Sequence, residues 1–178
     1  MVKVGINGFG RIGRLILRAI LENYKDKIQV VAINDLGSIE ANAHLIKYDS
    51  THGVLKDDIQ TSSDGFKIGN NQIKVFAEKN PANIPWKKVN ADIVLECTGI
   101  FLDKISAENH IKGGAKKVII SAPGKEVDFT IVQGVNSSEL KKEHNIISNG
   151  SCTTNCLAPV AMVMEKSFGI NYGYMTTI

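Results

Sequence analysis

The sequence predicts an α/β protein with a doubly wound, mainly parallel sheet and a small antiparallel insertion. Short apolar runs alternate with stretches of helical periodicity along most of the chain. The first strand, helix and strand fit within about 35 residues, the length of a βαβ unit, which implies parallel strands and a right-handed crossover. Three later runs separated by Asp64-Gly65 and Asn70-Asn71 indicate the antiparallel meander.

The βαβ unit opens the chain. Val2–Ile6 is an apolar run that stops at Asn7-Gly8, as is typical of a buried strand. Apolar residues three and four positions apart then indicate a helix from about Gly10 to Asn23. Ile28–Ile33 is apolar and β-branched, and it predicts the second buried strand.

The same alternation continues along the chain. Gly113-Gly114 ends one of the later helices. The further predicted elements are a helix over Ile39–Tyr48, meander strands Ile59–Thr61, Phe66–Ile68 and Gln72–Phe76, a strand Asp92–Glu96, a helix Asp103–Lys112, and strands Val118–Ser121, Phe129–Val132 and Asn145–Ser148.

A domain boundary is expected near Asn149–Ser151, which divides the chain into residues 1–150 and 151–178. The second part begins with a one-sided apolar helix. Pro159 falls early in this helix or bends it, and Gly169 ends it. Ile170–Ile178 then predicts the beginning of another strand.

Composition argues against several classes of protein. A formal net charge of +3, from scattered basic residues, gives no sign of a nucleic-acid partner. No segment approaches the ~18 apolar residues of a membrane helix, and the first residues do not form a signal peptide. Three cysteines make no disulfide framework, so we expect a cytoplasmic protein.

Three glycines open the first predicted helix in the sequence Gly8-Phe9-Gly10-Arg11-Ile12-Gly13. Gly8 permits a tight turn, Gly10 lets a pyrophosphate approach the backbone, and Gly13 lets the helix pack on the sheet. The free N–H groups and the positive dipole end of the helix then face the phosphates. Because these glycines have this spacing and stand between a predicted strand and a predicted helix, they predict a dinucleotide site rather than a plain turn.

Asp35 follows the second strand, 22 positions after Gly13. An acidic residue at this place accepts hydrogen bonds from the adenosine ribose and repels a 2′-phosphate, so the predicted cofactor is NAD rather than NADP. Thr98 and Gly99, after the strand ending at Glu96, and Ser121 also fall at the carboxyl ends of strands, as either cofactor contacts or ordinary loop residues. We expect Cys97 to be a buried small hydrophobe.

Cys152 lies where a polar loop becomes the one-sided helix. A thiol at a helix N-terminus is favoured as the thiolate, which is the nucleophile. Position alone also allows a structural cysteine. A metal pair with Cys156 lacks a histidine near in sequence, so no metal is expected and Cys156 is predicted to be buried and inert.

The segment SNGSCTTNCLAP resembles the active-site signature of the phosphorylating, NAD-dependent glyceraldehyde-3-phosphate dehydrogenases. The resemblance covers essentially the whole chain. It is carried also by VGINGFGRIGR, AHLIKYDSTHG, ECTGIF, KGGAKKVIISAP and YGYMTTI.

This resemblance implies that Cys152 is the nucleophile of a glycolytic enzyme and that Ser151 and Thr153 bind substrate. The implied partners are a phosphorylated aldehyde, inorganic phosphate and other copies of the chain, since the family is tetrameric. With the residues suggested by position, the predicted NAD site comprises Asn7, Gly8, Gly10, Arg11, Ile12, Gly13, Asn34, Asp35, Lys79, Thr98, Gly99 and Ser121.

Two residues depart from the family pattern: Gly150 stands where alanine is frequent, and Lys79 where arginine is frequent. The resemblance also implies that the catalytic histidine directly follows Ile178, so a polypeptide of these 178 residues is expected to be inactive and to associate through its exposed C-terminal segment. The alternatives are a non-catalytic NAD-binding module and an enzyme of the same family for another phosphorylated aldehyde, such as erythrose 4-phosphate.

Overall fold

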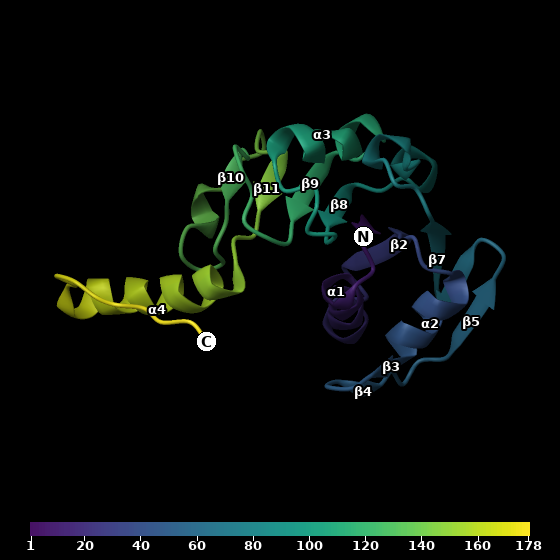
Figure 1. Cartoon of the computed structure of the whole chain (residues 1–178), viewed down its shortest axis with the longest axis horizontal. Coiled ribbons are helices and arrows are strands. Elements are labelled where there is room, and N and C mark those ends of the chain that lie inside the picture. The colour runs from purple at the N-terminus through teal and green to yellow at the C-terminus, as the bar shows by residue number, and fades with distance from the viewer.

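A nine-stranded sheet organises the computed structural model, which describes residues 1–178 (Figure 1). Its strand order is β10-β11-β9-β8-β1-β2-β7-β6-β5. The elements of the first half are β1 (Val2–Asn7), α1 (Arg11–Asn23), β2 (Ile28–Asn34), α2 (Ile39–Lys47), β3 (Tyr48–Asp49), β4 (Gly53–Val54), β5 (Ile59–Ser62), β6 (Gly65–Ile68) and β7 (Asn71–Phe76). Those of the second half are β8 (Ile93–Glu96), α3 (Lys104–Lys112), β9 (Lys117–Ile120), β10 (Phe129–Thr130), β11 (Ile146–Ser148) and α4 (Cys152–Phe168), with single 3-10 turns at Pro81–Asn83, Trp86–Val89 and Ser137–Glu139.

The sheet reverses its winding beside β1. Strand β1 pairs in parallel with β2 on one side and with β8 on the other. Strands β9, β11 and β10 continue the parallel sheet beyond β8. The predicted doubly wound class is therefore confirmed, and in such sheets a ligand binds at the carboxyl ends of the strands beside this reversal.

Both faces of the sheet are covered. Helices α1 and α2 enclose one core with the inner side chains of β1 and β2, centred on Ile6, Leu17 and Ile33. On the opposite face, Trp86 of a 3-10 turn packs with Val94 of β8. Ala107 of α3 packs there with Val118 and Ile120 of β9. The central strands are covered on both faces of the sheet, so side chains pointing to either face are buried. This explains why these strands are continuous apolar runs in the sequence.

The predicted meander is present, and it belongs to the main sheet. Strands β5, β6 and β7 pair antiparallel, while β7 also pairs in parallel with β2. Between α2 and β5 lies the two-stranded ribbon β3–β4, which no sequence pattern indicated. The buried Arg18 holds this ribbon to α1 by donating hydrogen bonds to the carbonyls of Ile46, Lys47, His52 and Gly53.

Helix α4 extends away from the sheet and has no buried residue (Figure 1). The prediction that Cys156 is buried is therefore wrong, since no neighbouring element packs on the helix. The predicted strand over Ile170–Ile178 is also absent, because the segment has no strand to pair with. The helix runs through Pro159 to its end at Phe168. No helix of the structure has both the length and the apolar character needed to cross a bilayer.

Asp128 fixes the start of β11, the strand that leads to Cys152. Its carboxylate accepts from the N–H groups of Asn145 at 2.8 Å and Ile146 at 2.9 Å, and from Lys104 Nζ at 2.6 Å. Burial raises the pKa of Asp128, but these three donors outweigh it and bring the pKa down to about 2.

We expect Asp128→Asn to lower the free energy of unfolding by about 1.5–3 kcal/mol at pH 7, the usual worth of hydrogen bonds to a charged group. Because the folded-state pKa is depressed, this stabilisation is present above about pH 4 and lost as the pH falls towards 2. Urea denaturation of both proteins from pH 7 to pH 2.5 measures the difference. Asp26→Asn, at an exposed site, serves as the control; a difference that stays constant over this range would contradict the assignment.

Candidate functional site

A cavity of about 580 Å³ opens at the carboxyl ends of β1, β2 and β8. It contains most of the predicted cofactor residues. The lining residues that the sequence predicted are Asn7, Gly8, Gly10, Asn34, Asp35, Lys79 and Thr98. Those that it missed as cofactor contacts are Leu36, Glu78, Cys97, Ile100 and Phe101.

The glycine loop after β1 is shaped by close contacts. Gly8 has φ +86°, and a Cβ there would lie 2.8 Å from the backbone nitrogen of Thr98. A Cβ at Gly13 would come within 2.3 Å of the Gly8 carbonyl oxygen, so the helix packs directly on the loop. Gly10, in contrast, faces open space. The loop therefore leaves its backbone accessible at the N-terminus of α1, as a phosphate requires.

Asp35 lies in the cavity wall at the end of β2. Its Oδ2 accepts from the N–H of Phe9 at 2.8 Å, and its Oδ1 accepts from the N–H of Gly37 at 2.9 Å. These bonds tie the glycine loop to the β2 end and fix the carboxylate. An ionised carboxylate has about four acceptor positions, so two remain for ribose hydroxyls.

Exposed apolar side chains form part of the cavity wall. Leu36 is 62% exposed and Ile100 is 72% exposed, although each lines the cavity. Apolar walls with a few placed polar groups are typical of small-molecule sites. Sequence reasoning missed these residues because they lie in loops, where no periodicity separates a contact from an ordinary surface residue.

Five predicted cofactor residues lie outside the cavity lining: Arg11, Ile12, Gly13, Gly99 and Ser121. The Arg11 guanidinium instead binds Asp49 Oδ2 at 2.9 Å. The N–H groups of His52 and Thr51, together with Arg11, hold the pKa of Asp49 well below its usual range. Arg11 and Ile12 can therefore offer backbone N–H groups from the first turn of α1, whereas the Arg11 side chain is engaged elsewhere.

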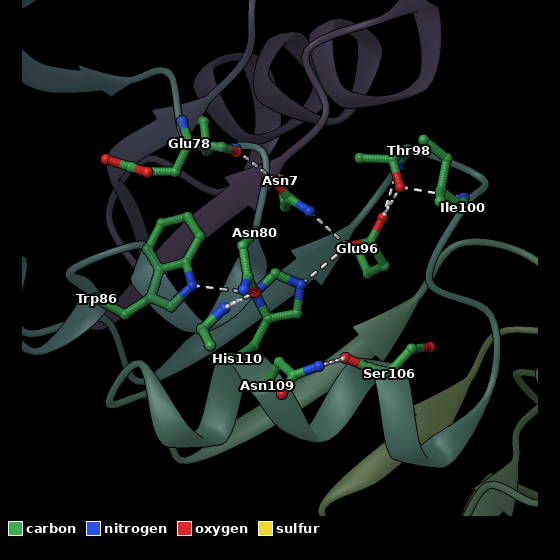
Figure 2. A network of polar contacts seen from close by, with 12 residues as sticks. Asn7, Glu78, Asn80, Trp86, Glu96, Thr98, Ile100, Ser106, Asn109 and His110 are labelled. Carbon is green, nitrogen blue, oxygen red and sulfur yellow. Dashed lines mark hydrogen bonds and ion pairs between the residues drawn. The ribbon is translucent and has the colours of Figure 1, made fainter.

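Thr98 turns its polar groups away from the cavity. Its backbone N–H donates to Glu96 Oε1 at 2.7 Å, and its hydroxyl contacts the same oxygen (Figure 2). The Thr98 hydroxyl also accepts from the N–H of Ile100 at 3.1 Å. The N–H and the hydroxyl of Thr98 are therefore already engaged in hydrogen bonds within the protein.

Cys97 behaves as the small hydrophobe that the sequence predicted. It packs against the core between α1 and the sheet. Burial raises the pKa of its thiol to about 11, so at neutral pH it is protonated. A thiol in this state is a poor nucleophile.

Cys152 is the first residue of α4 and its thiol is free and exposed. Ser151 caps the helix by accepting from the N–H of Thr154 at 2.9 Å. The preceding loop is fixed by Ser148, whose buried hydroxyl accepts from the N–H groups of Gly150 and Gly124, both at 3.0 Å. Cys152 therefore presents an exposed thiol on a well-anchored helix N-terminus, where the helix dipole favours an anion.

The cavity and Cys152 share one edge of the sheet. Cys152 follows β11, and the cavity lies at the ends of β8 and β1. Only β9 separates β11 from β8, so at ~4.8 Å per strand the two strand ends are about 10 Å apart. The structure contains no group of three or more His, Cys, Asp or Glu side chains that could hold a metal ion.

Gly150 adopts φ +65° immediately before the cap. A Cβ there would find room, since its nearest neighbour, in Thr154, is 3.5 Å away. We expect Gly150→Ala to cost about 1–2 kcal/mol of unfolding free energy, because left-handed backbone is unfavourable for an L-residue. Chemical denaturation measures the cost, with Gly173→Ala as the control at a glycine without positive φ. Equal stability of the two variants would contradict this expectation.

Comparisons with known proteins identify the family of this chain. Residues 2–104 match the sequence profile described as glyceraldehyde 3-phosphate dehydrogenase, NAD binding domain, and residues 151–178 match that of the C-terminal domain of the same enzyme. Among curated proteins, the chain is 55% identical over 178 residues to glyceraldehyde-3-phosphate dehydrogenase 2 of Streptomyces avermitilis. It is 53% identical over 177 residues to the glyceraldehyde-3-phosphate dehydrogenase of Xanthobacter flavus and 51% identical over 178 residues to that of Pseudomonas aeruginosa.

These alignments cover 99% of the chain and 53% of each relative. The chain thus spans about half the length of the curated relatives it matches. The profile over residues 2–104 describes a Rossmann-type NAD-binding domain, in agreement with the sheet and the cavity at its reversal point. The chain belongs to the glyceraldehyde-3-phosphate dehydrogenase family and carries its NAD-binding domain.

Proposed function

We propose that this chain supplies the NAD site and the nucleophile of an enzyme that oxidises glyceraldehyde 3-phosphate, with inorganic phosphate, to 1,3-bisphosphoglycerate. The single observation that carries the proposal is the placement of an exposed thiol on a helix N-terminus, at the same sheet edge as the cavity. The family relationship supplies the substrate class. Assembly into a tetramer is part of the same proposal and rests on the family resemblance alone.

The reaction begins at Cys152. Its thiolate attacks the aldehyde carbon and forms a thiohemiacetal, with Ser151 and Thr153 beside it to bind the substrate. NAD bound in the cavity would supply the acceptor for the hydride of this carbon. The resulting thioester on Cys152 is then attacked by inorganic phosphate, which breaks the C–S bond, releases the acyl phosphate and restores the thiolate.

The chain's own residues would bind and orient the cofactor. In the proposed arrangement, Gly8, Gly10 and the N–H groups of Arg11 and Ile12 receive the pyrophosphate, while Asp35 accepts from the ribose hydroxyls. The remaining proposed contacts are Asn7, Gly13, Asn34, Lys79, Thr98, Gly99 and Ser121.

Thiol reactivity tests the assignment of Cys152. At pH 7 we expect iodoacetamide to alkylate Cys152 first, Cys156 more slowly and Cys97 last. A thiol with its pKa raised from 9.0 to about 11 has about a hundredfold less thiolate, and Cys97 is also less accessible. Peptide mass spectrometry over time gives the three rates.

Cys156 is the matched control, because it is exposed on the same helix but one turn from the N-terminus. Added glyceraldehyde 3-phosphate should slow alkylation of Cys152 alone. Faster alkylation of Cys156, or equal slowing of both cysteines by the aldehyde, would argue against Cys152 as the nucleophile.

A further inference from the structure

A fully buried carboxylate lies directly beneath the cavity. Glu96, the last residue of β8, has a side chain with no exposed surface. Its Oε2 accepts from Asn7 Nδ2 at 2.6 Å and bonds to His110 Nε2 at 2.9 Å, while Oε1 faces the N–H and hydroxyl of Thr98 (Figure 2). Asn7 and Thr98 both line the cavity. The carboxylate is therefore one side chain away from the cavity.

The hydrogen-bond pattern fixes the charge on His110. The indole nitrogen of Trp86 lies 3.1 Å from His110 Nδ1, and an indole N–H can only donate. Nδ1 must therefore accept, which leaves the single ring proton on Nε2, where it donates to Glu96 (Figure 2). A doubly protonated ring would place two donors against each other at Nδ1. His110 is thus a neutral donor, and the Glu96–His110 contact is no ion pair.

The groups around Glu96 offer hydrogen bonds that favour its ionised form, but none of them is a Lys or Arg that would balance the negative charge. Every group that contacts the carboxylate can donate a hydrogen bond, which is the arrangement that an ionised carboxylate needs. No Lys or Arg forms an ion pair with it. A buried charge without a counter-ion is costly. In this fold the uncompensated negative charge lies at the point where the sheet reverses.

The position of Glu96 in the sheet indicates which half of the cofactor lies nearer to it. In doubly wound sheets the dinucleotide lies across the reversal point, with its two mononucleotide halves over the two halves of the sheet. Asp35, directly after β2, marks the adenosine half, so the strands beginning with β8 belong to the nicotinamide half. The oxidised nicotinamide ring is a cation, and it becomes neutral when it accepts a hydride.

We propose that Glu96, held ionised by Asn7, Thr98 and His110, acts as a buried counter-charge that favours the oxidised over the reduced cofactor. The proposal rests on the proposed NAD site and adds to it a residue that need not touch the ligand. The proposal predicts a change in the ratio of the affinities for NAD⁺ and NADH, rather than in either affinity alone. A residue that merely supports the fold would change both affinities together.

The test compares Glu96→Gln with Glu96→Asp and His110→Gln. Titration calorimetry with NAD⁺ and with NADH gives the ratio of the two dissociation constants for each protein. We expect Glu96→Gln, which removes the charge, to reduce the preference for NAD⁺ by about threefold to tenfold, as expected for two unit charges separated by partly polar protein. The other two variants keep the charge, so they are expected to weaken both forms and leave the ratio unchanged.

An unchanged ratio in Glu96→Gln, or an equal loss of preference in either control, would overturn the proposal. Trp86 is the only tryptophan, and its fluorescence and the circular dichroism report whether each variant is folded. If Glu96→Gln does not fold, the unaltered chain still decides: NAD⁺ must bind more tightly than NADH, and equal or tighter binding of NADH refutes the idea. Binding of neither form would refute the cofactor site itself and this proposal with it.

Discussion

A purified polypeptide of these 178 residues is expected to oxidise glyceraldehyde 3-phosphate at least about 10²–10⁴-fold more slowly than the full-length relatives. This expectation rests on the family resemblance, which implies a general base outside these residues, and general acid–base catalysis contributes about this factor. The measurement is NADH formation in the presence of the aldehyde, NAD and inorganic phosphate.

We expect none of the four histidines of the chain to take over this role. His110 is buried and uses both ring nitrogens, in contacts with Trp86 and Glu96. His44 packs on the ring of Tyr48 at 4.9 Å, and His144 packs on the ring of Phe129 at 5.0 Å. His52 belongs to the turn between β3 and β4. None of the four lines the cavity.

Calorimetric NAD binding by the same preparation is the control, because it separates a folded but inactive protein from an unfolded one. Turnover close to that of full-length relatives would show that a residue of this chain acts as the base. That result would contradict the assignment of the base beyond Ile178.

The second large effect is expected at Asp35. Asp35→Ala should weaken NAD binding by about tenfold to a hundredfold, since a hydrogen bond to a charged group is worth about 1.5–3 kcal/mol and 1.4 kcal/mol is a factor of ten. The same change removes the repulsion of a 2′-phosphate, so binding of NADP should fall much less or improve. Calorimetry with both cofactors measures the two changes.

Two controls sharpen this prediction. Asp35→Asn keeps the side-chain shape and an oxygen that can accept from the N–H of Phe9, so its loss of NAD affinity should be smaller. Asp26→Asn changes an exposed carboxylate at the other end of β2 and should leave both affinities unaltered. An equal loss for NAD and NADP in Asp35→Ala would mean that the residue supports the loop without recognising the ribose.

The sequence by itself determined the fold class and most of the strand-end residues that line the cavity. Alternating apolar runs and helical stretches fix which segments can be buried on both faces, and local chemistry fixes the ends of elements. Gly10 precedes α1, α4 begins at Cys152, and Gly169 ends it, each where the pattern indicated. The spacing from Gly13 to Asp35 predicted a carboxylate at the end of β2 because that distance is set by one helix and one strand.

The C-terminal segment shows where local pattern fails. The sequence predicted a strand over Ile170–Ile178. The one-sided apolar pattern of α4 predicted a buried helix face that would include Cys156. Neither exists in this structure, because strands and buried faces need a partner and none is packed there. Periodicity states what a segment can bury, but burial itself depends on what lies opposite it.

The tertiary structure alone decided how the cavity is lined and charged. Leu36 and Ile100 reach it from loops without any pattern, and the Arg11 guanidinium turns to Asp49 instead. The buried Glu96 carboxylate bonds to Asn7 and His110, and His110 in turn accepts from Trp86; these partners lie 10 to 89 positions from Glu96 along the chain. Hydrogen bonds between such distant residues follow from strand order and helix packing, which no local spacing encodes. Residues that line the cavity could thus be predicted from sequence, whereas the buried carboxylate beneath it could not.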